Sequence, residues 1–417
     1  MDSKIFKDSY FRNIISLMTG TGVAQLMPIL LSPVLTRIYS PYEFGVFAFY
    51  FSVSSILNIA STGRLELAIL IPEKSKEALL ILKSSFIVII AISFLVLCSI
   101  IVFHNYLEEI FNDKINVNYF YLLPLNIIVY GMYQSLNYWY NRNRQFKRLS
   151  LNRVLQSLFT LGLQISIGLI LYNSAIGLIL GSLIAQFVTL IMFFYSFIKV
   201  ERLFFYSTKL RDIFETIRKY KKFPLVDVPT MLLNLSANHL PNLFFNIVNA
   251  QVSAGNYYFS QRILQVPVTL LSASVLDVFK EEASSNYRVN GESIVVFKRT
   301  FKLLLYLTVV PSIFLWFFIE DLFILIFGEE WAIAGSFAKI LVPSLALRFI
   351  ANPLSYMIYI AQKQNINFFL MLFLFISILG VFLFDLNTIN IVSIISIVYC
   401  LYYILNIYIS AKLAKVL

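Results

Sequence analysis

Charged residues are scarce in this sequence. Only 13% of the 417 residues are Asp, Glu, Lys or Arg, while 59% are hydrophobic. A soluble globular protein carries about 25% charged and about 45–50% apolar residues. Because a soluble surface needs far more charge than this, the composition excludes a soluble enzyme and a disordered chain. Twelve membrane helices of about 20 residues each would use a share of the chain close to the apolar fraction.

Cysteine and histidine are nearly absent. Cys98 and Cys400 lie far apart in apolar runs, which excludes a disulfide scaffold and a metal-ligand spacing. His104 and His239 cannot form a metal cluster by themselves. The sequence also lacks a Walker motif, His-Glu-x-x-His and Asp-x-Asp. We therefore expect no metal site and no nucleotide cofactor.

What the sequence does contain is a series of apolar stretches long enough to cross a bilayer. They must be helices, because lipid offers no partner for exposed backbone groups and the alternation of a closed barrel is missing. We predict about 12 transmembrane helices in an all-α integral membrane fold. Their ranges are 13–36, 44–70, 79–103, 118–140, 153–172, 176–198, 223–249, 255–277, 300–319, 336–361, 366–384 and 391–410.

The basic residues predict the orientation. They gather in the connections 141–153, 199–222 and 278–302, whereas the connections on the opposite side are mostly acidic. By the positive-inside rule both termini are cytoplasmic. The net charge of +11 is then chiefly a topogenic signal, with contact to anionic membrane lipids as a consequence, and no nucleic-acid partner is needed to explain it.

The long polar segment divides the chain into two sets of six spans. We expect an N-terminal six-helix lobe over 1–200, a cytoplasmic connection over 201–222 and a C-terminal six-helix lobe over 223–417. A shift of roughly 210 residues brings Gly45 onto Gly255, which indicates a weak parallel repeat. Parallel repeats are a transporter plan in which the substrate site lies between the halves. A central cavity between two lobes is thus predicted.

Ionisable residues inside spans are the candidate site, because a charge in hydrocarbon normally faces a cavity or a partner. Arg348 is the deepest, about 18 Å from either surface at 1.5 Å per residue. It either lines an aqueous path or forms a buried ion pair. Arg262 either faces a cavity or extends to the interface. Arg64 either faces a cavity or is ion-paired.

Three further groups are weaker candidates. Glu66 lies two residues from Arg64, and such positions point to different sides of a helix, so the two are expected to contact different neighbours. Asp227 is either an interfacial acid or an ion-coupling group. His239 is either a proton carrier or a polar contact between helices. The excess of arginine over acid at depth predicts a cavity that attracts anions such as phosphate.

Several segments resemble one known family. They are residues 35–45 (LTRIYSPYEFG), 63–72 (GRLELAILIP), Phe223-Pro224, Leu240-Pro241, 254–257 (AGNY), 262–267 (RILQVP) and 327–331 (FGEEW). Their order and spacing are similar to those of Wzx-type polysaccharide flippases in the multidrug/oligosaccharidyl-lipid/polysaccharide exporter superfamily. The resemblance spans both halves of the chain.

The resemblance implies a function without covalent chemistry. An undecaprenyl-pyrophosphate-linked oligosaccharide repeat unit would move from the cytoplasmic to the outer leaflet of the bacterial inner membrane, for O-antigen or a related polysaccharide. Cavity arginines would hold the pyrophosphate, which makes Arg64 and Arg262 candidates, and an H⁺ or Na⁺ gradient would reset the cycle. A polysaccharide polymerase and a chain-length regulator are the implied protein partners.

Three other functions stay open, and a passive scaffold for a polysaccharide assembly complex is the third of them. One is export of small drugs or metabolites by the same fold, against which the deep arginines argue. Another is a membrane polymerase or transferase of the same pathway, which usually needs larger extramembrane loops than the roughly 14 residues of 104–117.

Overall fold

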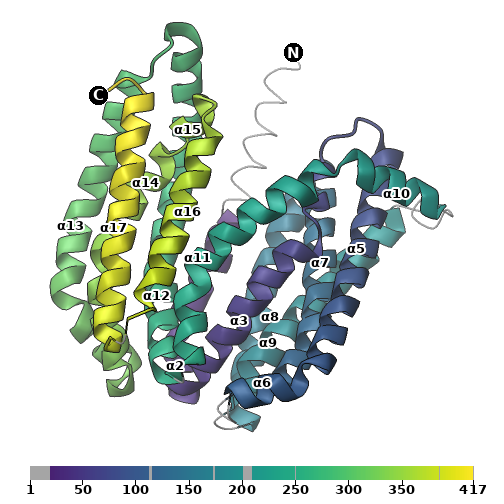
Figure 1. The fold of residues 1–417 in the computed structure, drawn as a ribbon, viewed down its shortest axis with the longest axis horizontal. Coiled ribbons are helices and arrows are strands. Elements are labelled where there is room, and N and C mark those ends of the chain that lie inside the picture. The colour runs from purple at the N-terminus through teal and green to yellow at the C-terminus, as the bar shows by residue number, and fades with distance from the viewer. Residues whose placement is uncertain are drawn as a thin grey trace. The chain divides into compact units, whose positions relative to one another are not determined.

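The computed structural model describes residues 19–111, 115–171, 174–200, 209–248, 250–384 and 386–416, and every regular element in these ranges is a helix (Figure 1). The elements of the first half are α2 (Ser32–Ile38), α3 (Pro41–Ser61), α4 (Leu65–Ala68), α5 (Ser75–Val102), α6 (His104–Phe111), η1 (Val117–Leu122), α7 (Leu123–Arg142), α8 (Phe146–Ile170), α9 (Ile176–Val200) and α10 (Leu210–Lys219). Those of the second half are η3 (Phe223–Asp227), α11 (Val228–Ile247), α12 (Gln251–Asn290), α13 (Ile294–Phe327), η4 (Glu329–Trp331), α14 (Ala332–Leu354), α15 (Met357–Ile360), α16 (Gln364–Val381) and α17 (Thr388–Leu413).

Membrane-spanning helices dominate the described residues and confirm the all-helical membrane class. Nine are long and apolar enough to cross a bilayer: Thr19–Ile38, Pro41–Ser61, Ser75–Val102, Phe146–Ile170, Ile176–Lys199, Gln251–Asn290, Ile294–Phe327, Glu329–Ile360 and Thr388–Leu413. Three further predicted ranges hold the more polar α7 and α11 and the shorter α16. The chain is thus a multi-pass membrane protein, and the count of twelve spans stays a prediction.

Several predicted boundaries were wrong. The range 44–70 is not one helix, because α3 ends at Ser61 and the chain turns before α4. Conversely, α12 and α13 are 40 and 34 residues long, well beyond 255–277 and 300–319. Polar residues outside a bilayer continue a helix as readily as apolar ones, so hydropathy marks the membrane segment and not the helix ends.

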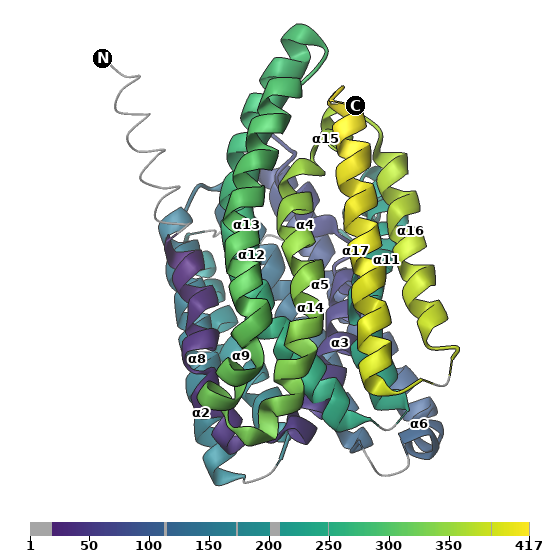
Figure 2. The ribbon, with the colours of Figure 1, turned by 90° about the vertical axis from the view of Figure 1, so that its left-hand side faces the viewer.

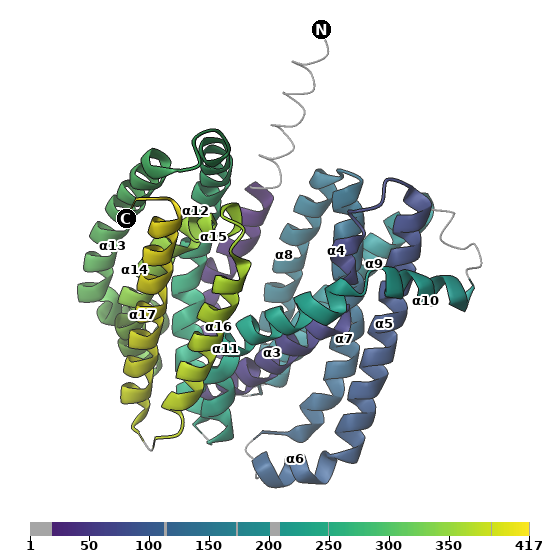
Figure 3. The same cartoon turned by 45° about the horizontal axis from the view of Figure 1, so that its top comes forward.

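By its internal contacts the chain divides into two compact units. The first contains Met1–Leu235 and Asn246–Asn249, and the second contains Ser236–Phe245 and Ala250–Leu417. In the first unit, α5, α7, α8 and α9 run side by side (Figure 1). The short helices α6 and α10 cross the opposite ends of α5 (Figure 3).

Close backbone approach holds α8 and α9 together in the first unit. The Tyr39 hydroxyl donates a hydrogen bond of 2.7 Å to the Gln164 carbonyl. A Cβ atom on Gly168 or on Gly177 would come within 2.4 or 2.2 Å of that hydroxyl oxygen. Only glycine leaves room for the phenol ring at these two positions.

The second unit is built around α14. It lies between α12 and α13 on one side and α17 on the other (Figure 2). The Ser260 hydroxyl of α12 donates to the Ala334 carbonyl of α14 at 2.6 Å, and the Ser396 hydroxyl of α17 donates to the Ile340 carbonyl at 2.7 Å. In lipid, where water does not compete, such interhelical hydrogen bonds add to side-chain packing.

Candidate functional site

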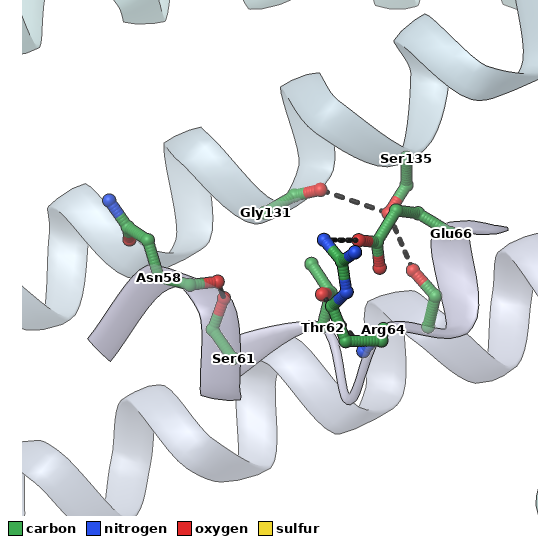
Figure 4. A network of polar contacts seen from close by, with 8 residues as sticks. Asn58, Ser61, Thr62, Arg64, Glu66, Gly131 and Ser135 are labelled. Atoms are coloured by element: carbon green, nitrogen blue, oxygen red, sulfur yellow. Dashed lines mark hydrogen bonds and ion pairs between the residues drawn. The ribbon is translucent and has the colours of Figure 1, made fainter. Parts of the chain in front are cut away.

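Arg64 sits in a tight turn of the first unit and not in a continuous helix. Gly63 and Arg64 have φ angles of 56° and 57°, in the left-handed region. Such a conformation is rare for arginine and costs about 1–2 kcal/mol per non-glycine residue. The Arg64 amide donates to the Thr62 hydroxyl at 3.2 Å, which closes the turn. The turn redirects the Arg64 side chain toward the start of α4 (Figure 4).

This turn brings Arg64 and Glu66 together, contrary to the prediction that they contact different neighbours. The Nη1 atom of Arg64 lies 3.6 Å from Oε1 of Glu66 (Figure 4), and their side chains are 17% and 3% exposed. The helical argument failed because the intervening backbone is not helical. Among the described residues, Nε of Arg64 is buried without a hydrogen-bond partner, so the guanidinium keeps one unused donor.

The surroundings of this pair are polar. Asp227, at the end of the π-helical segment η3, is close enough to Glu66 to interact with it electrostatically. Tyr130 and Tyr138 of α7 interact electrostatically with both Arg64 and Glu66. The described part of the first unit therefore gathers Arg64, two carboxylates and two phenols in one cluster, and Arg153 also interacts electrostatically with Tyr138.

Arg348 lines a cavity in the second unit. The cavity lies between α11, α12, α14 and α17, and its free volume is about 10 Å³, enough for roughly one water molecule. Its lining is mostly polar or aromatic: Asn238, Gln261, Gln265, Leu341, Ser344, Leu345, Arg348, Tyr399 and Tyr403. Within the ranges that the structure describes, no carboxylate lies within 4.0 Å of Arg348. Arg348 thus borders a small cavity without an ion pair among the described residues, and its place on an aqueous path stays a prediction.

The side chains around Arg348 include several tyrosines. The guanidinium interacts electrostatically with Tyr399, Tyr402 and Tyr403 of α17 and with Tyr257 of α12. Tyr399 is 6% exposed, and its hydroxyl has no hydrogen-bond partner among the described residues. An unpaired buried hydroxyl beside an unpaired cation is costly unless a ligand or water bonds to it.

The structure does not bring Arg262 into this cavity. Gln261 and Gln265 line it, but Arg262 points elsewhere from α12 and hydrogen-bonds with the Tyr258 hydroxyl one turn earlier. His239 follows the cavity residue Asn238 on α11 and is partly buried. Of the predicted residues in the second unit, Arg348 alone lines the cavity.

The sequence analysis missed the amides and phenols of the cavity. Gln261 with Gln265 and Tyr399 with Tyr403 are spaced i, i+4, so each pair shares one helix face. Polar residues repeated at this spacing in an apolar span were the signal that could have found them. The described residues contain no group of three or more His, Cys, Asp or Glu side chains that could hold a metal ion.

The fold is shared with solved transporters. A lipid II flippase, MurJ, in an inward closed conformation superposes with a TM-score of 0.75 at 13% identity, over 96% of this chain and 87% of that one. An inward-facing multidrug resistance MATE transporter of the MOP superfamily gives 0.69 at 15% identity, over 96% and 95%. A MOP superfamily transporter from Pyrococcus furiosus, whose title reports a binding pocket of reverse polarity, gives 0.65 at 15% identity, over 97% and 95%.

These likenesses establish a MOP transporter fold and nothing finer. No curated protein sequence matches the chain. One family model, described as "Polysaccharide biosynthesis protein", matches residues 34–335, which is well over half of the sequence and includes both predicted motifs around Arg64 and Arg262. The chain therefore belongs to the polysaccharide biosynthesis protein family and has the fold of the MOP superfamily transporters.

Proposed function

We propose that this protein is a flippase for a lipid-linked polysaccharide precursor. It moves an undecaprenyl-pyrophosphate-linked oligosaccharide repeat unit from the cytoplasmic to the outer leaflet of the bacterial inner membrane by alternating access. Membership of a polysaccharide biosynthesis family and a fold like that of a lipid II flippase support this proposal. The class of sugar, whether O-antigen or a related polymer, follows only from the resemblance of the sequence motifs.

The observation that carries the proposal is the free charge of Arg348. Among the described residues it has no carboxylate partner, and it borders a cavity of amides, hydroxyls and phenol rings inside a bundle of membrane helices. A half-buried guanidinium without a carboxylate partner is expensive among membrane helices, so the arrangement is suited to a site whose anion arrives with the substrate. Guanidinium groups bind phosphate oxygens through two parallel hydrogen bonds.

The cavity as it stands is too small for a pyrophosphate or a sugar. Room for about one water molecule means that α11, α12, α14 and α17 must separate before a head group enters. Alternating access supplies such a movement, because opening to one side loosens the helices that the closed state packs together. Arg64 and Arg262 stay proposed substrate contacts, which the same movement would have to expose.

Ion coupling is proposed for Glu66, Asp227 and His239. Glu66 and Asp227 suit this role because the Arg64 guanidinium pairs with Glu66, whereas Asp227 adds a second negative charge that repels the Glu66 carboxylate. A proton or Na⁺ entering this cluster would neutralise the repulsion, and its release would restore it. The role proposed for His239 rests on its place in an apolar span, next to the cavity residue Asn238.

Flipping in proteoliposomes tests the proposal. A fluorescent undecaprenyl-pyrophosphate oligosaccharide is reconstituted in both leaflets, and the outer fraction is quenched over time. Arg348→Gln should slow flipping by about tenfold or more, the worth of a charge-assisted hydrogen bond, and Arg348→Lys should restore part of the rate. Arg288→Gln, at an exposed position near the end of α12, is the matched control.

Three results would contradict the proposal. If Arg348→Gln flips the substrate at the wild-type rate, the anion site proposed at Arg348 is wrong. Transport of cationic dyes, but not of the lipid-linked substrate, would assign the protein to small-molecule export, the alternative that its likeness to MATE transporters keeps open. Formation of longer sugar chains by the purified protein would support the polymerase alternative.

A further inference from the structure

A second cavity lies on the other side of α14. Both α12 and α13 pack along α14, but they touch each other little, and the opening between them is a groove with a free volume of about 270 Å³. The groove is far larger than the Arg348 cavity. Val342, Ala346 and Phe349 of α14 form its floor, and the exposed Leu271 and Leu307 stand at its rim.

Prolines from both walls face this groove. Pro267 of α12 and Pro311 of α13 line it, and so do Ile263 and Leu307, the residues four positions earlier. Proline has no N–H and breaks the helical hydrogen bond to the carbonyl of that earlier residue. Each wall is therefore interrupted at the groove, where the helix is free to bend away from its neighbour.

The lining of the groove is apolar. No charged side chain contributes to it, and its two hydroxyl residues are Thr308 and Ser312. The Thr308 hydroxyl is used within α13, where it donates to the Leu304 carbonyl at 2.6 Å. A groove of this composition favours a hydrocarbon ligand, because a polar ligand would lose its hydrogen bonds to water there.

The groove and the Arg348 cavity share two helices, α12 and α14, and lie on different faces of them. On α14 the cavity is lined by Leu341, Ser344, Leu345 and Arg348. The groove is lined by Val342, Leu345, Ala346 and Phe349. These two stripes are offset by one residue, or about 100° around the helix. Leu345 lines both, so the cationic cavity and the apolar groove lie on adjacent faces of α14.

The same division occurs on α12. Gln261 and Gln265 face the polar cavity, whereas Leu264 and Val268 face the groove. Two helices with a polar side toward a cation and an apolar side toward an empty groove match an amphiphile with an anionic head and a hydrocarbon tail. Neither compartment by itself would distinguish such a molecule from a soluble anion or from an ordinary membrane lipid.

We infer that the groove between α12 and α13 binds the hydrocarbon tail of the lipid-linked substrate while its phosphate head occupies the Arg348 cavity, once the helices around that cavity have separated. This inference rests on the proposed function. The groove then selects the polyprenyl chain and holds the tail within the membrane beside the cavity. The head group alone changes leaflet, so the tail never has to enter the polar path.

Binding of two probes separates the tail site from the head site. Affinities for undecaprenyl pyrophosphate and for inorganic pyrophosphate are measured on the purified full-length protein in lipid nanodiscs. Ala346→Trp fills the floor of the groove. Excluding about two methylene groups should weaken undecaprenyl pyrophosphate binding by about tenfold, while binding of inorganic pyrophosphate stays at the wild-type value.

Matched variants make the comparison specific. Ile313→Trp adds the same ring to an exposed position of α13 that does not line the groove, and it should leave both affinities unchanged. Ala346→Leu is a smaller change that should weaken tail binding about threefold if the tryptophan variant does not fold. Arg348→Gln should weaken binding of both probes.

Each outcome decides one claim. If Ala346→Trp and Ala346→Leu bind undecaprenyl pyrophosphate like the wild type, the tail site is wrong, and the Arg348 site stands provided that Arg348→Gln still weakens both probes. If Arg348→Gln changes neither affinity while Ala346→Trp weakens the lipid probe, the proposed head site fails alone. Loss of the Ala346→Trp effect in excess phosphatidylglycerol would assign the groove to ordinary membrane lipid.

Discussion

Removing one partner of the Arg64–Glu66 ion pair should destabilise the first unit. Glu66→Gln keeps the shape of the side chain but leaves the Arg64 guanidinium, which is only 17% exposed, without its carboxylate. Arg64→Gln leaves the Glu66 carboxylate, 3% exposed, without its cation. Breaking a buried pair in this way costs about 3–5 kcal/mol, because the remaining charge is desolvated and uncompensated.

The geometry sets the size of the coupling. At 3.6 Å and an effective dielectric constant of about 20, the attraction is about 4–5 kcal/mol. Desolvation of both groups offsets part of it, so we expect a coupling free energy of about 1–3 kcal/mol between Arg64 and Glu66. The double variant should therefore cost less than the sum of the single variants by that amount.

A double-mutant cycle measures this coupling. Free energies of unfolding are obtained by SDS titration of the purified protein in detergent micelles for the wild type, both single variants and the double variant. Asp227→Asn is the control, because removing a negative charge near Glu66 relieves repulsion and should not destabilise the protein. A coupling below about 0.5 kcal/mol would refute the reasoning, since that is the value of an exposed pair.

Two further predictions concern backbone positions. Gly63→Ala should destabilise the protein by about 1–2 kcal/mol, because the Gly63 φ of 56° disfavours a Cβ atom. Gly162→Ala is the control and should not destabilise the protein, because no atom lies within 4 Å of the added Cβ. The same SDS titration compares the two variants. Gly168→Ala should lower the unfolding temperature by forcing the Tyr39 ring out of place, and Tyr39→Phe should recover part of the loss. Equal stability of both alanine variants in the first comparison, or a lack of recovery in the second, would contradict these expectations.

The membrane class and the helical content could be predicted from the sequence because both depend on local hydropathy. Any apolar run of about 20 residues must become a helix in lipid, whatever its neighbours are. The weak internal repeat stays a prediction. Helices α3 and α12 begin at Pro41 and Gln251, which preserves the shift of roughly 210 residues between Gly45 and Gly255.

The prediction for Arg64 and Glu66 failed for the opposite reason. It assumed helical geometry between them, and hydropathy carries no information on whether an apolar run is interrupted. Gly63 and Arg64 adopt left-handed backbone angles between the end of α3 and the start of α4. Whether the Arg64 and Glu66 side chains meet therefore depends on two backbone φ angles that the residue pattern does not specify.

The depth of Arg348 follows from counting residues, but its surroundings do not. Tyr399 and Gln261 lie far from it in sequence, on α17 and α12, and they meet it because both helices pack against α14. The groove beside it exists because α12 and α13 contact α14 more closely than each other. Which face of a helix meets which neighbour is set by packing among distant segments. The sequence thus determined that this chain crosses membranes as helices that carry arginines, and the tertiary structure decided that Arg64 meets Glu66 while Arg348 borders a polar cavity.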